Sequence, residues 1–427
     1  MPAHALSELR FERHTLSNGL RVVLHRDPGL PLVAVNLWYH VGSKDERPGR
    51  TGFAHLFEHM LFQGSEHVGP NDHFHYVQQA GGVANGSTWY DRTNYYETLP
   101  AHHLDLGLWL ESDRMGFLLP ALTEKQLATQ REVVMNERRQ RVDNQPYGRA
   151  FERLNELLYP ADHPYHWPVI GTLEDIAAAR LDEVAAFFTT FYAPNNAVLT
   201  LAGDFSPGRA LESVERYFGP IPRGPEASAP DAALPRLDGE RRAILEDDVR
   251  LPRVYLGYRV PRFGERAWYA ADLLATALAG GKSSPLYADL VYRRQIAQDV
   301  SASVFPTELC ATVLVVATGR PEVAPADLEA ALSEHLDRCA ATPVAGADLE
   351  RGRNLLLTSY FQEIQKLDNR ADLFSFFTTC FDDPGRVATE PERYAELDGA
   401  DLAACAADYL RRDQRAVVTV VPRGSAR

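Results

Sequence analysis

Three segments of the chain carry apolar runs that are typical of buried strands. Leu32–Val41 reads LVAVNLWYHV, and Ala193–Phe205 is a turn followed by the apolar run AVLTLAG. Gly81–Pro100 is rich in Thr, Tyr and Asn and has paired glycines, which predicts a strand, a turn and a second strand. Near the N-terminus, Asn18 and Gly19 predict a tight hairpin between two short strands.

Amphipathic periodicity predicts helices between these strands. Apolar residues recur at helical spacing in the segments Phe53–Leu61, Asn71–Ala80, His102–Leu119, Thr123–Val142, Asp175–Tyr192 and Arg209–Phe218. The stretch Asn144–Gly171 is polar and contains prolines, which predicts a long loop that holds one helix.

A linker divides the chain near its middle. Residues 219–240 are rich in Pro, Ala and Gly and show no periodicity. The second half repeats the order of the first, because VYLGYRV at 254–260 follows the linker as an early apolar strand and RAVVTVVPRG near the C-terminus echoes NAVLTLAGDF. We therefore predict an α+β fold of two similar α/β-sandwich halves, each a mainly antiparallel sheet with helices packed on it, related by internal duplication. The expected domains are 1–218 and 241–427.

Composition narrows the classes of function. The 427 residues are 45% hydrophobic and carry a net charge of -14, which is ordinary for a globular chain and argues against a nucleic-acid partner. No apolar run is long enough to span a membrane, and the N-terminus lacks the apolar core of a secretory signal. The four cysteines form no C-x-x-C pair, which is typical of free thiols in a reducing compartment. We expect a cytoplasmic protein without a membrane partner.

The predicted helix at Phe53–Leu61 carries the motif H-x-x-E-H. His55, Glu58 and His59 fall at positions i, i+3 and i+4, which is one face of a helix. Two imidazoles at i and i+4 can bind one zinc ion, and a neighbouring carboxylate can act on the bound water. Chance histidines are the alternative, but the apolar opposite face of this helix favours a metal site. The corresponding helix of the second half, Arg266–Ala279, has no histidine, so we expect metal only in 1–218.

Several motifs together resemble a known family. HLFEH, GGVANGSTWYDRTNYY, QREVVMNERR, PYHWPVIGT, FYAPNNAVLTLAGDF and GGKSSPLY resemble the pitrilysin and insulinase superfamily of zinc peptidases, in which H-x-x-E-H is the zinc motif. The likeness covers essentially the whole chain. It is closest to the small two-domain branch that includes mitochondrial processing peptidase and its bacterial relatives.

The resemblance implies a third zinc ligand on another helix. Glu137 occupies the matching position, and Glu132, five residues earlier on a different helical face, is its rival. The family has a second glutamate seven residues before the ligand, where this chain has Gln130, which can accept a hydrogen bond but carries no charge. Six more histidines are expected at the surface or around the site, and not on the zinc: His73, His75, His102, His103, His163 and His166.

The resemblance also implies a mechanism. One zinc ion per chain, held by His55, His59 and Glu137, would polarise a water molecule, and Glu58 would take its proton as general base. An edge strand in the family pairs with an extended substrate, and an ordinary sheet edge is the alternative here. The residues expected to bind substrate in this way are Ala84, Asn85, Gly86, Ser87 and Thr88.

The predicted function is a zinc-dependent endopeptidase that cleaves extended or unfolded peptides inside a chamber. A non-catalytic scaffold or binding subunit of the same family is the main alternative, and a metal-dependent hydrolase of other substrates is a weaker one. An intact H-x-x-E-H motif favours catalysis. A zinc-dependent cleavage assay separates these functions.

A partner subunit is expected as well. Self-sufficient relatives carry an Arg, and a Tyr seven residues later, that hold the substrate near the zinc. In the matching frame, Gly280–Val300, these positions fall on Val291 and Gln298, and neither can donate a charge-assisted hydrogen bond. We expect this chain to be the zinc-bearing subunit of a heterodimer whose paralogous partner supplies the Arg and Tyr. A homodimer without the pair is the alternative.

Overall fold

The computed structural model describes residues 9–228, 230 and 234–424. These residues form two compact units, and each unit contains one sheet covered by helices. The first unit is drawn from 1–138, 167–230 and 361–389, and the second from 139–166, 231–360 and 390–427. The α+β class predicted from the sequence is confirmed.

The first unit is built on a six-stranded sheet in the order β1-β2-β6-β3-β5-β4. The strands are β1 (Glu12–Thr15), β2 (Arg21–Arg26), β3 (Leu32–Tyr39), β4 (Val83–Thr88), β5 (Thr93–Pro100) and β6 (Ala197–Gly203). Only β2 and β6 pair in parallel, and the other neighbours are antiparallel. The central strands β3 and β6 are buried along almost their whole length, which explains their continuous apolar runs. β4 is an edge strand.

Helices cover both faces of this sheet. They are α1 (Phe53–Met60), α2 (Asp72–Gln79), α3 (Leu104–Phe117), α4 (Glu124–Arg138), α6 (Leu173–Ala178), α7 (Leu181–Phe191), α8 (Pro207–Phe218) and α13 (Leu367–Phe381). α3 packs on the face to which Val35 belongs, where Gly107 allows close approach. α13 packs on the opposite face, which carries Asn36 and Trp38.

The second unit is built on a five-stranded sheet in the order β7-β11-β8-β10-β9. The strands are β7 (Arg241–Asp247), β8 (Arg253–Val260), β9 (Ala297–Val304), β10 (Ala311–Gly319) and β11 (Arg415–Pro422). The helices are α5 (Ala150–Leu158), α9 (Arg266–Ala279), α10 (Pro285–Tyr287), α11 (Pro325–Ala341), α12 (Gly346–Gln365), α14 (Arg386–Ala395) and α15 (Gly399–Tyr409). The chain passes between the units within α12 and again within α14.

The two sheets share one topology. β2, β6, β3, β5 and β4 correspond in order to β7, β11, β8, β10 and β9, and the first pair is parallel in both sheets while the others are antiparallel. Only β1 has no counterpart among the described residues. The shared order and strand sense support the predicted internal duplication.

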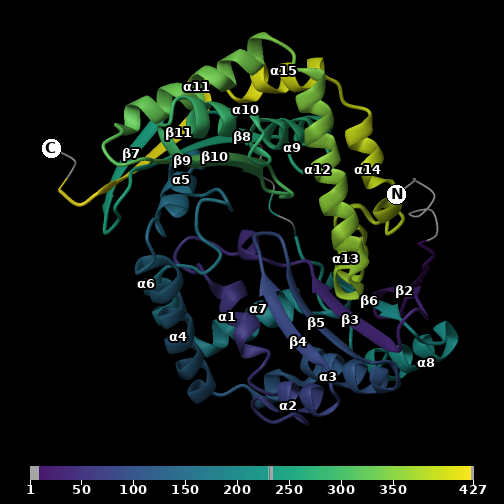
Figure 1. Cartoon of the computed structure of the whole chain (residues 1–427). Helices are drawn as coiled ribbons and strands as arrows, with labels where there is room; N and C mark the ends of the chain where they lie inside the picture. Colours follow the sequence, from purple (N-terminus) through teal and green to yellow (C-terminus); the bar gives the residue numbers. More distant parts are fainter. Residues whose placement is uncertain (1–8, 229, 231–233, 425–427) are drawn as a thin grey trace. The chain divides into compact units, whose positions relative to one another are not determined.

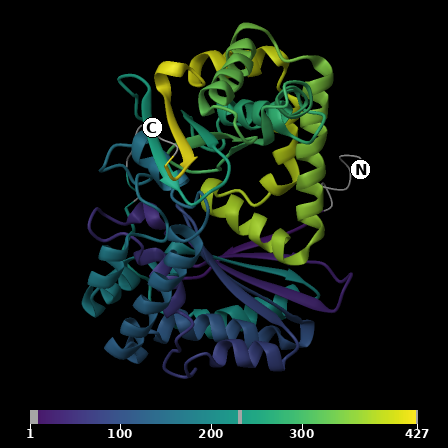
Figure 2. The same cartoon turned by 60° about the vertical axis from the view of Figure 1, so that its left-hand side comes forward.

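The units are not the two continuous pieces of chain that the linker at 219–240 predicts. α5, from the first half of the sequence, packs on β8 and β11 of the second unit, where Gly257 of β8 makes room for Leu154 and Leu158. α13, from the second half, packs on β3 and β6 of the first unit. The colours of Figure 1 show this exchange, because blue α5 lies beside the green sheet and yellow-green α13 beside the purple strands; Figure 2 shows α13 from another side.

Two predicted helices differ from the observed ones. The helix predicted at Thr123–Val142 ends at Arg138, and a π-helical turn, η5 (Arg139–Asp143), follows it. The segment Asp175–Tyr192 lies in two helices, α6 and α7, separated at Ala179 and Arg180. The described residues of 219–240 form no helix or strand. In the described part of the chain, no helix is long and apolar enough to cross a bilayer.

Candidate metal centre

The H-x-x-E-H motif lies on α1, which begins after a glycine in the left-handed region. Gly52 has a φ of 85°, and a Cβ there would lie 2.6 Å from the carbonyl oxygen of Ile170, so glycine is required. The Glu46 carboxylate accepts hydrogen bonds from the N–H groups of Gly52 and Ala54, each at 2.8 Å. The first N–H groups of a helix have no partner within it. Glu46 therefore fixes where α1 starts.

The residues of α1 divide into a core face and a partly exposed face. Phe53, Leu56, Phe57 and Met60 are buried in the core of the unit. His55, Glu58 and His59 are half-buried, and the ring centroids of the two histidines are 4.9 Å apart. The structure thus gathers the three motif side chains on one face, as their spacing predicts.

α4 brings the carboxylate of Glu137 to the two imidazoles. Oε2 of Glu137 lies 3.2 Å from Nε2 of His59 and 3.8 Å from Nε2 of His55. α4 is tied to the end of α1, because Nε2 of Gln126 donates a hydrogen bond to the carbonyl oxygen of Gln63 at 2.9 Å. Three side chains from two helices therefore converge.

The three donors fit a catalytic zinc site. In a tetrahedral site with bonds of about 2.0–2.1 Å, neighbouring ligand atoms lie roughly 3.3 Å apart. The ligand atoms of His55, His59 and Glu137 all lie within 4.8 Å of one another. Their side chains are 13%, 23% and 16% exposed, so the group is open to solvent on one side. This opening leaves room for a fourth ligand.

The rival residues of α4 lie elsewhere. Glu132 is exposed, while Glu137 is half-buried beside the histidines. Gln130 is buried on the same helix, with 6% of its surface exposed. That Gln130 accepts a hydrogen bond from a ligand imidazole stays a prediction.

Glu58 faces both the histidines and the edge strand β4. Its Oε2 accepts a hydrogen bond from Oγ1 of Thr88 at 2.6 Å. Burial raises the pKa of the Glu58 carboxyl, whereas the Thr88 hydrogen bond and the nearby His59 and Arg92 side chains lower it. A raised pKa suits a carboxylate that takes up and returns a proton near neutral pH.

The edge strand β4 lies beside Glu58. A Cβ on Gly86 would lie 3.2 Å from Cγ of Glu58, so the glycine keeps this approach open. The N–H group of Gly86 donates to Oδ1 of its neighbour Asn85 at 2.9 Å. Among the described residues, β4 pairs with β5 alone. The five residues predicted to bind substrate therefore all lie on a sheet edge, and their contact with a peptide stays a prediction.

A second group of His and Glu side chains lies in the interior of the same unit. His73 of α2, Glu97 of β5 and Glu111 of α3 place one nitrogen and two carboxylates within 4.8 Å of one another, and all three residues are buried. His73 was expected at the surface or around the site, and the surface position is wrong. Only 4% of its surface is exposed, because α2 turns the ring toward β5 and against the ring of Phe62.

Arg114 makes this buried group different from the first. Its guanidinium pairs with the Glu111 carboxylate through two hydrogen bonds, Nε to Oε2 at 2.8 Å and Nη2 to Oε1. Burial raises the pKa of Glu97 well above its ordinary value and lowers that of His73 well below. Burial thus disfavours charge on Glu97 and on His73, and Arg114 supplies the counter-charge for the Glu111 carboxylate. A divalent cation would leave the group charged in a dry interior, which is costly, so these residues do not fit a metal.

The other five of the six histidines expected at the surface or around the site are spread over both units. His75 and His102 are exposed, and His103 and His166 are partly exposed. His163, expected at the surface or around the site, is buried in the second unit with its Nε2 3.8 Å from Sγ of Cys310. Burial lowers the pKa of His163 to about 4. Its place in a polar, proline-containing loop gave no sign of this burial.

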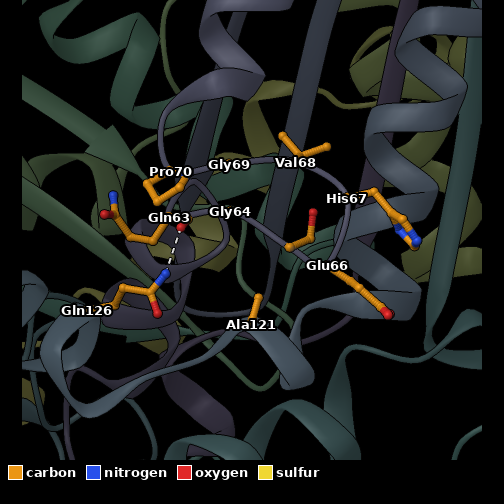
Figure 3. Close-up of a pocket in the computed structure, with 10 residues that line it drawn as sticks. Gln63, Gly64, Glu66, His67, Val68, Gly69, Pro70, Ala121 and Gln126 are labelled. Carbon is orange, nitrogen blue, oxygen red and sulfur yellow. Dashed lines mark hydrogen bonds between the residues drawn. The ribbon is translucent and has the colours of Figure 1, made fainter.

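A pocket follows the end of α1 (Figure 3). The loop Gln63–Pro70 lines it together with Ala121 and Gln126, and Figure 3 shows the hydrogen bond from Gln126 to Gln63. Asp113 anchors this loop, because it accepts hydrogen bonds from Oγ of Ser65 at 2.5 Å and Nδ1 of His67 at 2.6 Å. The pocket lining includes none of the candidate zinc ligands.

Two family models match the chain in succession. The model described as "Insulinase (Peptidase family M16)" matches residues 21–171, which include the H-x-x-E-H motif and Glu137. The model described as "Peptidase M16 inactive domain" matches residues 178–356. The second match agrees with the absence of histidines from α9.

Relatives and solved structures agree with the family models. The zinc protease PqqE of Helicobacter pylori is 30% identical over 98% of this chain and 95% of its own length. An uncharacterized zinc protease of Mycobacterium leprae is 32% identical over 68% of this chain and 65% of its own length. A crystal structure of a protease from Helicobacter pylori has a TM-score of 0.90 at 29% identity, covering 97% of this chain and 99% of its own. A crystal structure of a peptidase M16 inactive domain from Pseudomonas fluorescens shares the fold, with a TM-score of 0.87 at 18% identity over 98% of this chain and 99% of its own. The chain therefore belongs to peptidase family M16.

Proposed function

We propose that this chain is a zinc endopeptidase that cleaves extended or unfolded peptides. The observation that carries the proposal is the convergence of His55, His59 and Glu137 beside Glu58. The zinc protease names of the relatives support the same function. A zinc ion held by these three residues would polarise a water molecule and lower its pKa toward neutrality.

Glu58 is the proposed general base. It lies one position before His59 on α1, and Thr88 orients its carboxylate from the neighbouring strand. The carboxylate accepts a proton from the attacking water and returns it to the leaving amine. Neither role requires Glu58 to bind the metal.

β4 is the proposed docking strand for the substrate. An extended peptide adds to the free edge through main-chain hydrogen bonds, which tolerate many sequences. Pairing at Gly86 would replace the hydrogen bond that its N–H group makes with Asn85. Pairing along β4 also brings a peptide next to Glu58, because Gly86 adjoins that side chain.

A partner subunit completes the proposal. Val291 is buried in the core of the second unit, and Gln298 is an exposed amide on β9. Neither side chain can supply positive charge to a developing oxyanion, so we propose a heterodimer with a paralogue that supplies an Arg and a Tyr. A chamber closed with this partner would admit unfolded peptides and exclude folded proteins. A homodimer remains the competing assembly.

The competing function is a non-catalytic subunit of the same family. Two observations favour it, namely the match of 178–356 to an inactive-domain model and the Val and Gln at the expected Arg and Tyr positions. An intact set of three ligands and a base argues against it.

The test assays the purified chain alone and then with its co-purifying paralogue. Unfolded peptides and a folded globular protein are offered, with and without a chelator. We expect zinc-dependent cleavage of the peptides only, appearing when the paralogue is added. Full activity of the chain alone would refute the heterodimer. No cleavage by the complex, with zinc present, would refute the peptidase.

A further inference from the structure

Asp372, on α13, is the centre of a hydrogen-bond network on the first sheet. Its Oδ1 accepts hydrogen bonds from Nδ2 of Asn94 at 2.7 Å, Nε1 of Trp38 at 2.7 Å and Nδ2 of Asn36 at 3.2 Å. The three donors lie on β3 and β5. α13 lies outside the residues that either family model matches. One oxygen atom of Asp372 thus connects α13, which is distant in sequence, to β3 and β5.

Asn94 carries this network to the edge strand β4. While its Nδ2 donates to Asp372, its Oδ1 accepts hydrogen bonds from Oγ of Ser87 at 2.7 Å and Nη1 of Arg92 at 3.1 Å. Nη1 of Arg92 also donates to the carbonyl oxygen of Ser87 at 2.8 Å. The Asn94 amide therefore donates through its nitrogen to Asp372 and accepts through its oxygen from Ser87 and Arg92. Ser87 makes hydrogen bonds through both its hydroxyl group and its carbonyl oxygen.

β4 lies between this network and the proposed general base. Successive residues of a strand point to opposite faces. Ser87 faces the Asp372 network, and the next residue, Thr88, donates its hydroxyl proton to Glu58 on the other face. A shift of Ser87 therefore moves both the strand edge and the hydrogen bond that orients Glu58.

We propose that Asp372 is a positioning residue that sets the place of β4, and through β4 that of a bound peptide and of the Glu58 carboxylate. The catalytic consequences rest on the proposed peptidase function. The placement of β4 does not, and can be measured in a protein that cleaves nothing.

Matched variants separate the hydrogen bonds from the charge. All three donors share Oδ1, so Asp372→Asn keeps an acceptor oxygen for them while Asp372→Ala removes it. Asp368 lies one turn earlier on α13, so Asp368→Ala controls for the loss of an acid from this helix. Asn94→Ala removes the bond that Asn94 donates to Asp372 and the bonds that it accepts from Ser87 and Arg92, and it spares the bonds that Asp372 accepts from Asn36 and Trp38.

The first measurement is steady-state cleavage of an extended peptide by the zinc-loaded protein, assembled with its paralogue where activity requires it. Displacement of the reacting groups by about 1 Å can cost about 100-fold in rate, and we expect a loss of that order in kcat/KM for Asp372→Ala and Asn94→Ala. Both KM and kcat should change, because β4 positions the peptide and Glu58. Asp372→Asn should retain most of the activity, and Asp368→Ala all of it. Zinc content should be equal in all variants.

The second measurement is amide hydrogen exchange along β4, which needs no activity. We expect faster exchange at Ser87 and Thr88 in Asp372→Ala, in Asn94→Ala and in Ser87→Ala. The double variant Asp372→Ala/Ser87→Ala should exchange no faster than the faster single variant, because both changes break one chain of bonds.

Two results would overturn the proposal. One is a lower Tm for Asp372→Ala with unchanged exchange in β4 and unchanged KM, which would make Asp372 an anchor for α13 alone. The other is additive effects of Asp372→Ala and Ser87→Ala. If Asp372→Ala does not fold, Asn94→Ala decides by the same two readouts. A wild-type protein that cleaves no peptide refutes the proposed function, and the exchange data still decide the role of Asp372.

Discussion

The first unit contains two His–Glu groups of similar composition and opposite character. His55, His59 and Glu137 are partly exposed, whereas His73, Glu97 and Glu111 are buried around Arg114. Both groups place their ligand atoms within the same 4.8 Å. Distance between ligand atoms therefore does not distinguish a metal centre from a structural network.

The two groups differ in their access to solvent and in the positive charge that Arg114 supplies to the buried group. The exposed group leaves a carboxylate and two imidazoles with an open side, which suits a metal ion and its water. In the buried group, Arg114 already neutralises Glu111, and its guanidinium lies 4.2 Å from the centroid of the Tyr95 ring. The same types of side chain thus suit a metal centre in one place and a packed network in the other.

The largest effect on zinc content and activity is expected from substitutions in the partly exposed group. His55→Ala, His59→Ala and Glu137→Gln should each remove a zinc ligand, so bound zinc and peptidase activity should both be lost. Glu132→Gln is the matched control on α4. Zinc content by elemental analysis is the measurement, with about one zinc per wild-type chain expected. Full zinc in Glu137→Gln together with loss in Glu132→Gln would reverse the ligand assignment.

Removal of the base should leave the metal in place. Glu58→Gln keeps the shape of the side chain and its hydrogen-bond acceptor for Thr88 but cannot take a proton. We expect kcat to fall by about 10²–10⁴, the usual contribution of a general base, with normal zinc content. Loss of zinc from this variant would mean that Glu58 is itself a ligand.

Breaking the buried group should affect stability and not metal. Arg114→Met leaves the Glu111 carboxylate without its counter-charge in the interior, which typically costs about 3–5 kcal/mol of unfolding free energy. Urea unfolding of the zinc-loaded protein measures the loss. The zinc content of the folded fraction should equal that of the wild type. A fall in zinc for this variant or for Glu97→Gln would identify the buried group as a metal site.

The smallest effect is a change in pH dependence. Burial raises the pKa of Glu97 from 4.5, so its contribution to stability is complete below that pH and declines as the pH rises. The pKa of His73 is lowered from 6.5, so its contribution is complete above that pH and is lost as the pH falls. The contribution of Glu97 falls by up to about 1.4 kcal/mol per pH unit between the pKa of the unfolded chain and the raised pKa of the folded one.

Glu97→Gln isolates this decline, because an amide does not titrate. Urea midpoints at pH 5, 6.5 and 8 should show the variant gaining stability relative to the wild type as the pH rises. Parallel curves for the two proteins would show that Glu97 is ionised in the folded state, and the contrast between the two groups would then be weaker.

Local sequence patterns predict most of the helices and strands, and they place the H-x-x-E-H side chains on one face of a helix. The apolar run at 32–41 contains β3, and the spacing of His55 and His59 places them on one face of α1. Glu137 was implied by family resemblance, and no local signal separates it from Glu132. The family resemblance indicates which residue of α4 meets the histidines of α1. Periodicity within one helix cannot indicate a contact between two helices.

Long-range contacts account for what the sequence did not reveal. His73 is buried because its side chain lies against residues of α3 and β5, and the sequence pattern of α2 alone does not place His73 on an apolar face. The role of Asp372 depends on residues 334 and 336 positions earlier in the chain. The exchange of α5 and α13 follows from packing against sheets formed by the other half, so the linker at 219–240 could not indicate it.

The exchange of α5 and α13 imposes an order on folding during synthesis. A ribosome adds 334 residues between Trp38 and Asp372, which takes roughly 17–70 s at about 5–20 residues per second. During that interval, the face of β3 that α13 covers has no partner from its own chain. A nascent chain that stops before Leu367 therefore lacks a layer of its first unit, and chaperones that hold unfinished sheets have a long period in which to bind it.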